Sequence, residues 1–379
     1  MGSYDRGRRQ ERGDDQASQG KRSHVMRLPE GPIIIVGGSG FIGSNLADSY
    51  LRDGEEVIVL DNLSRPGVEE NLRWLKSNHG DRVQPAIIDI RDFDAIAPYF
   101  MGARAVFHLA AQTAVTTSLD YPVHDFETNA RGTLNVLEAV RKAGNRAPVI
   151  FASTNKVYGD IHDIAMAGLE DRYIPADELL RENGFDEDRG LNFCTPYGCS
   201  KGVADQYVLD YAKSFGSLTA VLRMSCIYGP RQFGTEDQGW VAHFLIRALN
   251  GEAISIYGDG RQVRDILHVN DAVRAYRGLL NSIDEAKGKA FNLGGGPDNA
   301  VSIRIVLREI ERVIGRPIAT MHSDWRVGDQ LYFVTNTSAL RKAIGWAPEI
   351  AWRDGVRELC DWIASNRLNG FARARRASA

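Results

Sequence analysis

Short apolar runs, separated by longer amphipathic segments, mark the first half of the chain. The runs cover residues 33–36, 56–60, 105–109 and 149–152, and valine and isoleucine are frequent in them. Continuous apolar runs of this length are typical of parallel strands that are buried on both faces. Apolar residues with helical spacing lie between them, for example over residues 133–142. The alternation predicts an α/β fold with a doubly wound parallel sheet and right-handed crossovers.

The pattern becomes less regular in the second half of the chain. Clusters of glycine, proline and aspartate interrupt it, at residues 228–230, 258–260 and 294–297. We expect residues 30–190 to form most of the sheet domain, and residues 191–366 to complete the sheet and add a smaller C-terminal lobe that caps a cleft. The polar residues 1–29 lack apolar periodicity, which predicts a disordered tail, and residues 367–379 are expected to form a second polar tail.

Composition excludes several classes of protein. The chain has 379 residues, with 46 basic and 49 acidic side chains, so its net charge of −3 gives no reason to bind nucleic acid or an anionic membrane. No apolar run approaches the roughly 18 residues of a membrane span. The four cysteines form no C-x-x-C pair, and they stand at Cys194, Cys199, Cys226 and Cys360. We therefore expect a soluble cytoplasmic protein with free thiols and no structural metal.

A glycine-rich turn follows the first predicted strand and leads into a helix expected to begin near Ser44. Its residues are Gly37, Gly40, Phe41, Ile42 and Gly43 in a G-x-x-G-x-x-G pattern. Glycines allow the backbone to approach a pyrophosphate, and the helix N-terminus supplies N–H donors and a positive dipole end. A turn that only links strand to helix is the alternative. In this context we favour a Rossmann-type dinucleotide site.

Acidic residues near the next strand ends indicate which dinucleotide binds. Asp61 ends the second predicted strand, where a carboxylate accepts hydrogen bonds from both ribose hydroxyls and repels a 2′-phosphate. This favours NAD, although the nearby Arg65 leaves NADP as an alternative. Asn62 follows Asp61, and Asp89 with Ile90 is expected to end the third strand and flank the adenine.

The fourth predicted strand ends in small residues that permit close approach to a dinucleotide. The stretch after His108 contains Ala110, Ala111 and Gln112, which we assign to the cofactor site. His108 could act as a base, but a histidine within an apolar strand is more often packed in the core. We therefore favour the packed interpretation.

Tyr197 and Lys201 are four residues apart and would share one face of a helix. A positive charge beside a phenol lowers its pKa, which would make Tyr197 a base for a sugar hydroxyl while hydride leaves the same carbon. A hydroxyl for the reacting oxygen would come from Thr154 or Ser153, just after the fifth predicted strand. Their alternative role is to cap the next turn.

These motifs together resemble a known family over residues 31–365. The motifs are the glycine turn, Asp61-Asn62, HLAAQ at 108–112, NARGT at 129–133, STNKVYG at 153–159, YGCSK at 197–201 and RDILHV at 264–269. In this order they are similar to the extended short-chain dehydrogenases/reductases that modify nucleotide sugars. The resemblance implies NAD as cofactor, a nucleoside-diphosphate sugar as substrate, and a homodimer or homotetramer.

The resemblance also implies roles for single residues. Tyr197 would be the base, Lys201 would bind the nicotinamide ribose and tune Tyr197, and Thr154 would be the third catalytic residue. Asn129, which we include among the cofactor-site residues, would support the Tyr197 helix and the sheet. Relatives that dehydrate or decarboxylate the sugar usually carry an acid just after the catalytic Thr or Ser, where this chain has Asn155 and Lys156.

The missing acid favours epimerisation, in which a ring carbon is oxidised to a ketone and hydride returns to the opposite face. A 4,6-dehydratase or reductase of the same family, or a non-catalytic NAD-binding relative, remains the alternative. Diphosphate recognition would fall to isolated arginines, with surface salt bridges as their other role, namely Arg231, Arg264 and Arg326. Residues just past the fourth strand would contact the hexose, in particular Gln112, Thr117 and Ser118.

Overall fold

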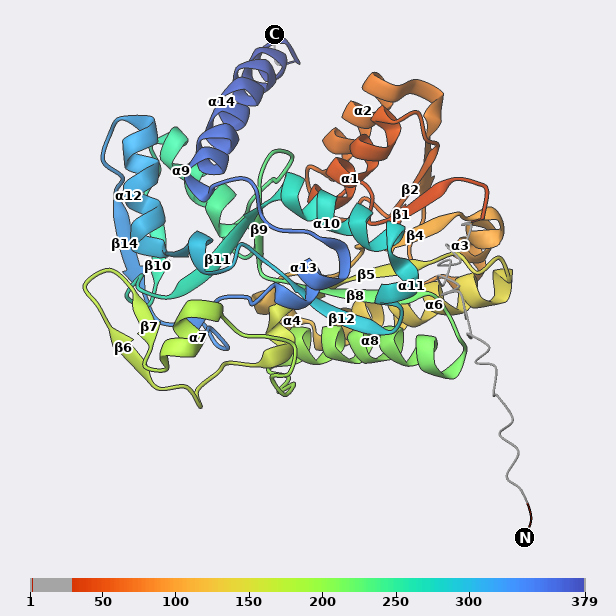
Figure 1. Ribbon diagram of the computed structural model, residues 1–379. Helices are drawn as coiled ribbons and strands as arrows, with labels where there is room; N and C mark the ends of the chain where they lie inside the picture. Colours follow the sequence, from red (N-terminus) through yellow and green to blue (C-terminus); the bar gives the residue numbers. More distant parts are fainter. Residues whose placement is uncertain (1, 3–28, 378–379) are drawn as a thin grey trace.

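A seven-stranded, all-parallel sheet forms the larger part of the molecule in a computed structural model, which describes residue 2 and residues 29–377 (Figure 1). Its strand order is β12-β8-β5-β4-β1-β2-β3. The strands are β1 Ile33–Val36, β2 Val57–Asp61, β3 Val83–Ile87, β4 Ala105–His108, β5 Val149–Thr154, β8 Thr219–Met224 and β12 Lys289–Leu293. The order reverses between β1 and β4, where open α/β sheets bind their ligands. The predicted doubly wound sheet is confirmed.

Both faces of this sheet are buried, which explains the unbroken apolar runs of its strands. Ile33 and Ile35 pack toward one layer of helices, and Ile34 and Val36 pack toward the other. The first layer consists of α1 Phe41–Arg52, α2 Val68–His79, α10 Val269–Asn281, α11 Ile283–Ala286 and α13 Ser338–Ile344. The second layer consists of α3 Phe93–Ile96, α6 Gly132–Ala143 and α8 Thr195–Ser214. The short helices α4 Val115–Asp120 and α5 Pro122–Phe126 contact α8.

A second lobe has its own sheets and its own core. Its four-stranded sheet contains β9 Cys226–Tyr228, β11 Val263–His268, β13 Ala300–Ser302 and β15 Tyr332–Phe333. A parallel pair is formed by β10 Ile254–Tyr257 and β14 Thr320–Ser323. Apolar side chains join β9, β10, β11 and β13 to α9 Trp240–Asn250, α12 Ile303–Ile314 and α14 Trp352–Ala377. The smaller lobe expected from the sequence is therefore present beside the main sheet.

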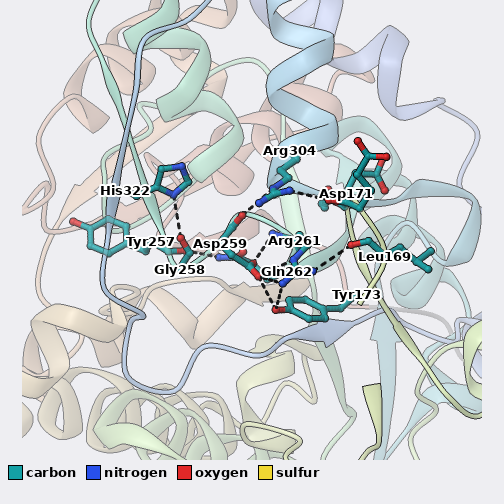
Figure 2. A network of polar contacts seen from close by, with 12 residues as sticks. Leu169, Asp171, Tyr173, Tyr257, Gly258, Asp259, Arg261, Gln262, Arg304 and His322 are labelled. Carbon is teal, nitrogen blue, oxygen red and sulfur yellow. Dashed lines mark hydrogen bonds and ion pairs between the residues drawn. The ribbon is translucent and has the colours of Figure 1, made fainter. Parts of the chain in front are cut away.

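A hairpin from the middle of the chain is attached to this lobe by polar contacts (Figure 2). It pairs β6 Met166–Gly168 with β7 Tyr173–Pro175, and α7 Glu178–Asn183 follows it. The Tyr173 hydroxyl donates to Asp259 at 2.6 Å, and Arg261 donates to the same carboxylate at 2.7 Å. Arg304 of α12 donates to the Asp259 carbonyl at 2.9 Å. The Tyr173 hydrogen bond attaches residues 166–175 to the loop between β10 and β11, and the two arginines hold Asp259 in place.

Several element boundaries differ from the sequence-based expectation. Helix α1 begins at Phe41 rather than near Ser44, because Gly40 is its extended N-cap residue. Strand β3 ends at Ile87, so Asp89 and Ile90 lie in the loop that follows it. Helix α14 continues to Ala377, so most of the expected tail at 367–379 has a helical backbone. The expected tail at 1–29 lies almost wholly outside the described residues.

Candidate functional site

A cleft of about 750 Å³ opens at the carboxyl ends of the main-sheet strands and extends toward the second lobe. It is lined by the end of β2, by the loop that follows β4, and by the ends of β5 and β8. The sequence-predicted residues that line it are Gly37, Gly40, Phe41, Ile42, Gly43, Asp61, Asn62, Asp89, Ile90, Ala110, Ala111, Gln112, Thr117, Thr154 and Tyr197. The fold therefore brings most of the predicted site into one cavity.

The glycine turn forms a tight cradle at one end of the cleft. Gly37 has φ +81°, and a Cβ there would lie 2.6 Å from the backbone nitrogen of Ala110. A Cβ at Gly43 would lie 2.2 Å from the carbonyl oxygen of Gly37. Only glycine allows this approach between the turn, the first residues of α1 and the end of β4. The cradle and the helix N-terminus fit the pyrophosphate of a dinucleotide.

Asp61 stands at the end of β2 with its carboxylate held in place by backbone donors. Ser39 N–H donates to Oδ2 at 3.0 Å, and Leu63 N–H donates to Oδ1 at 2.9 Å. Burial raises the pKa of Asp61, and these backbone hydrogen bonds oppose the shift. Each carboxylate oxygen accepts more than one hydrogen bond, so Asp61 can still bind ribose hydroxyls.

The neighbouring side chains of the ribose and adenine region are also fixed. Asn62 Nδ2 donates to Asp89 at 2.9 Å. The Arg91 guanidinium lowers the pKa of Asp89 through hydrogen bonds at 2.8 and 3.0 Å. Arg65, the residue that left NADP open, donates to Thr113 at 3.0 Å and to Gln238 across the cleft. Its guanidinium is therefore already engaged with protein acceptors, which supports the NAD assignment.

The predicted catalytic pair consists of Thr154, the last residue of β5, and Tyr197, in the first turn of α8. Both side chains line the cleft, and the Thr154 hydroxyl forms a hydrogen bond with the phenol. Ser153 is the less suitable hydroxyl, because it donates to the buried Asp205 at 2.7 Å. A substrate hydroxyl that reaches this pair would have a phenol as its proton acceptor and a second hydroxyl to orient it.

Lys201 is on the same helix as Tyr197 but points into the protein. Its ammonium donates to the Ala152 carbonyl at 2.7 Å and lies 4.1 Å from the centre of the Phe151 ring. Burial lowers its pKa to about 7, against the attraction of Asp205 and Asp125. Lys201 is not among the side chains that line the cleft. Its predicted contact with the nicotinamide ribose remains a prediction.

The expectation that Lys201 lowers the pKa of Tyr197 does not hold in this structure. Burial raises the pKa of the Tyr197 phenol to about 12, and the hydrogen bond from Thr154 reduces the shift only in part. The negative charge of Asp125 adds to the increase. Desolvation dominates because the phenol is withdrawn from water while the ammonium is directed to a carbonyl.

A buried polar network behind Tyr197 was only partly foreseen. Asn129 donates to the Gln112 carbonyl at 3.1 Å and to Ser200 of α8 at 3.0 Å, and it accepts from Gln112 N–H at 2.8 Å. Asn129 thus links the loop after β4 to α8, which is the supporting role we expected. Its side chain does not line the cleft. Asp125 accepts from both Asn129 and Ser200, and sequence reasoning missed it. Its position one helical turn before Asn129 was the available signal.

Ser118 and His108 also belong to the supporting structure. Ser118 is fully buried, donates to the Val115 carbonyl at 2.6 Å, and accepts from the Tyr197 backbone N–H at 3.2 Å. These contacts fix the start of α8, whereas we had expected Ser118 to touch the hexose. His108 is packed, as favoured from the sequence: its Nε2 lies 2.9 Å from the Thr133 hydroxyl, and burial lowers its pKa to about 3.

The three predicted diphosphate ligands lie at different places, and none is among the side chains that line the described cleft. The Arg231 guanidinium lies 3.8 Å from the centre of the Trp74 ring. Arg326 lies 3.9 Å from the centre of the Tyr257 ring and donates to the Glu236 carbonyl at 3.0 Å. Arg264 is buried and donates to Asp329 at 2.6 Å. The role of each toward a diphosphate stays a prediction.

Sequence reasoning also missed part of the lining on the second-lobe side. The additional lining residues there include Cys226, Gln232, Gln238 and Trp240, and Lys156 joins them from the segment after β5. Their sequence signal is weak, because Cys226 and Trp240 stand at the first positions of β9 and α9 and the two glutamines lie in the loop between these elements, so no spacing fixes their direction. Within the described part of the chain, no helix combines the length and apolar character needed to cross a membrane.

Comparisons with known proteins agree with this site. Residues 33–294 match the NAD dependent epimerase/dehydratase family. The chain is 42% identical over 339 residues to CDP-paratose 2-epimerase of Salmonella typhi, covering 88% of this chain and 99% of that protein.

Two solved structures extend the comparison to three dimensions. UDP-glucose 4-epimerase of Thermus thermophilus, in complex with NAD, is 31% identical with a TM-score of 0.72, covering 88% of this chain and 98% of that one. The dTDP-glucose 4,6-dehydratase DesIV of Streptomyces venezuelae, with NAD bound, is 26% identical with a TM-score of 0.77, covering 89% and 98%. The chain belongs to the NAD-dependent epimerase/dehydratase family of sugar-nucleotide enzymes, and its cofactor is NAD.

Proposed function

We propose that this enzyme epimerises a nucleotide-activated hexose by transient oxidation to a ketone and return of hydride to the opposite face. The observation that carries the proposal is the Thr154 and Tyr197 pair at the cleft, followed by Asn155 and Lys156 rather than by a carboxylic acid. The pair supports oxidation and reduction of a hydroxyl-bearing carbon. The missing acid argues against elimination of a second hydroxyl.

The protein side of the mechanism follows from the two hydroxyl groups. Thr154 orients the reacting oxygen, and Tyr197 takes its proton during oxidation and returns it during reduction. Bound NAD supplies the hydride acceptor and donor, and the positive charge of its nicotinamide favours the phenolate. Such help is needed because burial alone raises the pKa of Tyr197 to about 12. The network of Asn129, Asp125 and Ser200 holds the start of α8 while the proton moves.

A dehydratase is the main alternative, because members of both activities resemble this chain. The segment after Thr154 argues against it. Asn155 donates to the Gln330 amide oxygen at 3.2 Å, and Lys156 donates to the Gly328 carbonyl at 3.0 Å. The Asn155 amide cannot protonate a departing hydroxyl. The Lys156 ammonium is fixed to a carbonyl, so neither residue replaces the carboxylic acid that dehydratase relatives usually carry at this place. The intact Thr154 and Tyr197 argue against a non-catalytic NAD-binding relative. A net reductase would use the same pair and differs from an epimerase in that it consumes its cofactor.

For the substrate, the proposal is a CDP-linked hexose handled as in CDP-paratose 2-epimerase. Support comes from the 42% identity to that Salmonella typhi enzyme over nearly its whole length. The segments 153–160 and 197–207, which carry Thr154 and Tyr197, also resemble that enzyme. A homodimer or homotetramer in the cytoplasm completes the proposal and stays a prediction.

The test is to incubate the purified enzyme, with its bound NAD, with CDP-paratose, UDP-glucose and dTDP-glucose in separate reactions. Proton NMR of the products should reveal a C2 epimer from CDP-paratose, without net change in the nicotinamide absorbance at the end of the reaction. A 4-keto-6-deoxy product from dTDP-glucose would identify a dehydratase instead. In parallel reactions supplied with NADH, net oxidation of the NADH in proportion to product would identify a reductase.

A further inference from the structure

Lys156 is a cation at the cleft that the proposed mechanism does not yet use. It follows the catalytic Thr154 by two residues, and its side chain lines the same cavity as Thr154 and Tyr197. Its ammonium donates to the Gly328 carbonyl at 3.0 Å. An ammonium has three N–H donors, so this contact fixes its direction and leaves donors for a ligand.

A second cation lies close behind Lys156 and is fixed to the same loop. Arg264 is buried in β11 and donates to Asp329, the residue after Gly328, at 2.6 Å. The Arg264 charge acts on Lys156, and burial together with this repulsion lowers the pKa of Lys156 to about 8. The negative charge of Asp329 acts in the opposite direction. Lys156 and Arg264 therefore have the Asp329 carboxylate as their nearby negative charge, and Arg264 already forms an ion pair with it.

Such an excess of positive charge away from water is costly unless an anion is bound there. A half-buried, incompletely paired ammonium at a cleft therefore marks a ligand contact rather than a device for stability. The hydrogen bond to the Gly328 carbonyl holds the Lys156 ammonium at the cavity wall, where a bound anion can reach it.

We propose that Lys156 binds the phosphoryl group attached to the sugar in the substrate, beside the reacting carbon held by Thr154 and Tyr197. This inference rests on the proposed function and makes it more specific. In a nucleotide sugar that phosphoryl group is on the anomeric carbon, and the adjacent ring carbon is C2. A cation two residues from the catalytic Thr154 therefore suits a reaction next to the phosphate, as in a 2-epimerase.

The test measures binding of nucleoside diphosphates to the NAD-loaded enzyme by titration calorimetry, without turnover. CDP, UDP and dTDP are titrated into the wild-type protein, and the tightest ligand is carried forward together with its nucleoside. Lys156→Met should weaken binding of the diphosphate by about 10- to 100-fold, because a charge-assisted hydrogen bond is lost. Binding of the nucleoside and of NAD should not change.

Two further variants keep the outcome interpretable. Lys156→Arg retains the charge and should bind the diphosphate within a few fold of wild type, and Lys156→Gln replaces Lys156→Met if the latter fails to fold. Lys213→Met removes an exposed lysine near the end of α8 and should bind like wild type. Equal diphosphate affinity in wild type and Lys156→Met overturns this inference alone. Failure of the wild type to bind any nucleoside diphosphate overturns the proposed function as well.

Discussion

The two sides of the cleft are built in different ways. The cofactor side is formed by strand ends and by the turns directly after them, so Gly37, Gly43 and Asp61 are positioned by local backbone geometry. The substrate side is assembled from segments far apart in sequence: Lys156 is fixed by Gly328, and Arg65 reaches Gln238. The cofactor side is therefore a property of the fold, whereas the substrate side depends on long-range contacts between irregular segments.

The largest expected effect lies where the two sides meet, at Tyr197. Tyr197→Phe removes the proton acceptor but only one oxygen, so packing and NAD binding should be retained. Loss of general base catalysis should reduce kcat by about 100- to 10,000-fold. Epimerisation assays combined with quantification of bound NAD check this. A variant that turns over at the parent rate would remove Tyr197 from the mechanism.

A smaller effect is expected on the substrate side at Arg264. If it holds the diphosphate, Arg264→Ala should raise KM by about 10- to 100-fold, from loss of a charge-assisted contact of roughly 1.5–3 kcal/mol. NAD affinity should not change. Arg308→Ala is the matched control, because that exposed arginine pairs with Asp171 and is not among the side chains that line the cleft. An unchanged KM would assign Arg264 to its ion pair with Asp329 alone.

On the cofactor side, Asp61→Asn should reduce NAD affinity by about tenfold, because the charge is lost while an amide oxygen remains. The ratio of NAD affinity to NADP affinity should also decrease. Fluorescence titrations with both cofactors measure this. Tighter binding of NADP than of NAD by the wild-type protein would contradict the role of Asp61.

The smallest effect concerns stability rather than activity. His108 has a pKa of about 3 in the folded protein, below its ordinary value near 6.5, so the unfolded chain takes up a proton that the folded chain does not. The free energy of unfolding should therefore fall as pH decreases from 6.5 toward 3, with a His108 contribution of roughly 1 kcal/mol at pH 5.5. Urea denaturation at pH 5.5 and 7.5 should reveal less pH dependence in His108→Gln than in wild type.

The difference between the two sides also explains what the sequence could predict. The glycine turn, Asp61 and Tyr197 follow from spacing and strand ends, and the structure places them in the cleft lining, whereas their roles stay predictions. The stacking of Arg231 on Trp74 depends on contacts 157 residues apart in the chain, which no local pattern reveals. The pKa of Tyr197 was misjudged for a similar reason, because burial by tertiary packing outweighs the nearby lysine.

In the proposed mechanism, the hydride that leaves the ring carbon returns to the same carbon and does not exchange with solvent hydrogen. The most direct measurement is to run the epimerisation in D₂O and examine the product by mass spectrometry and NMR. The account predicts that the epimerised carbon keeps its original hydrogen and carries no deuterium. Deuterium at that carbon would show removal and return of a proton instead, and would contradict oxidation and re-reduction through NAD.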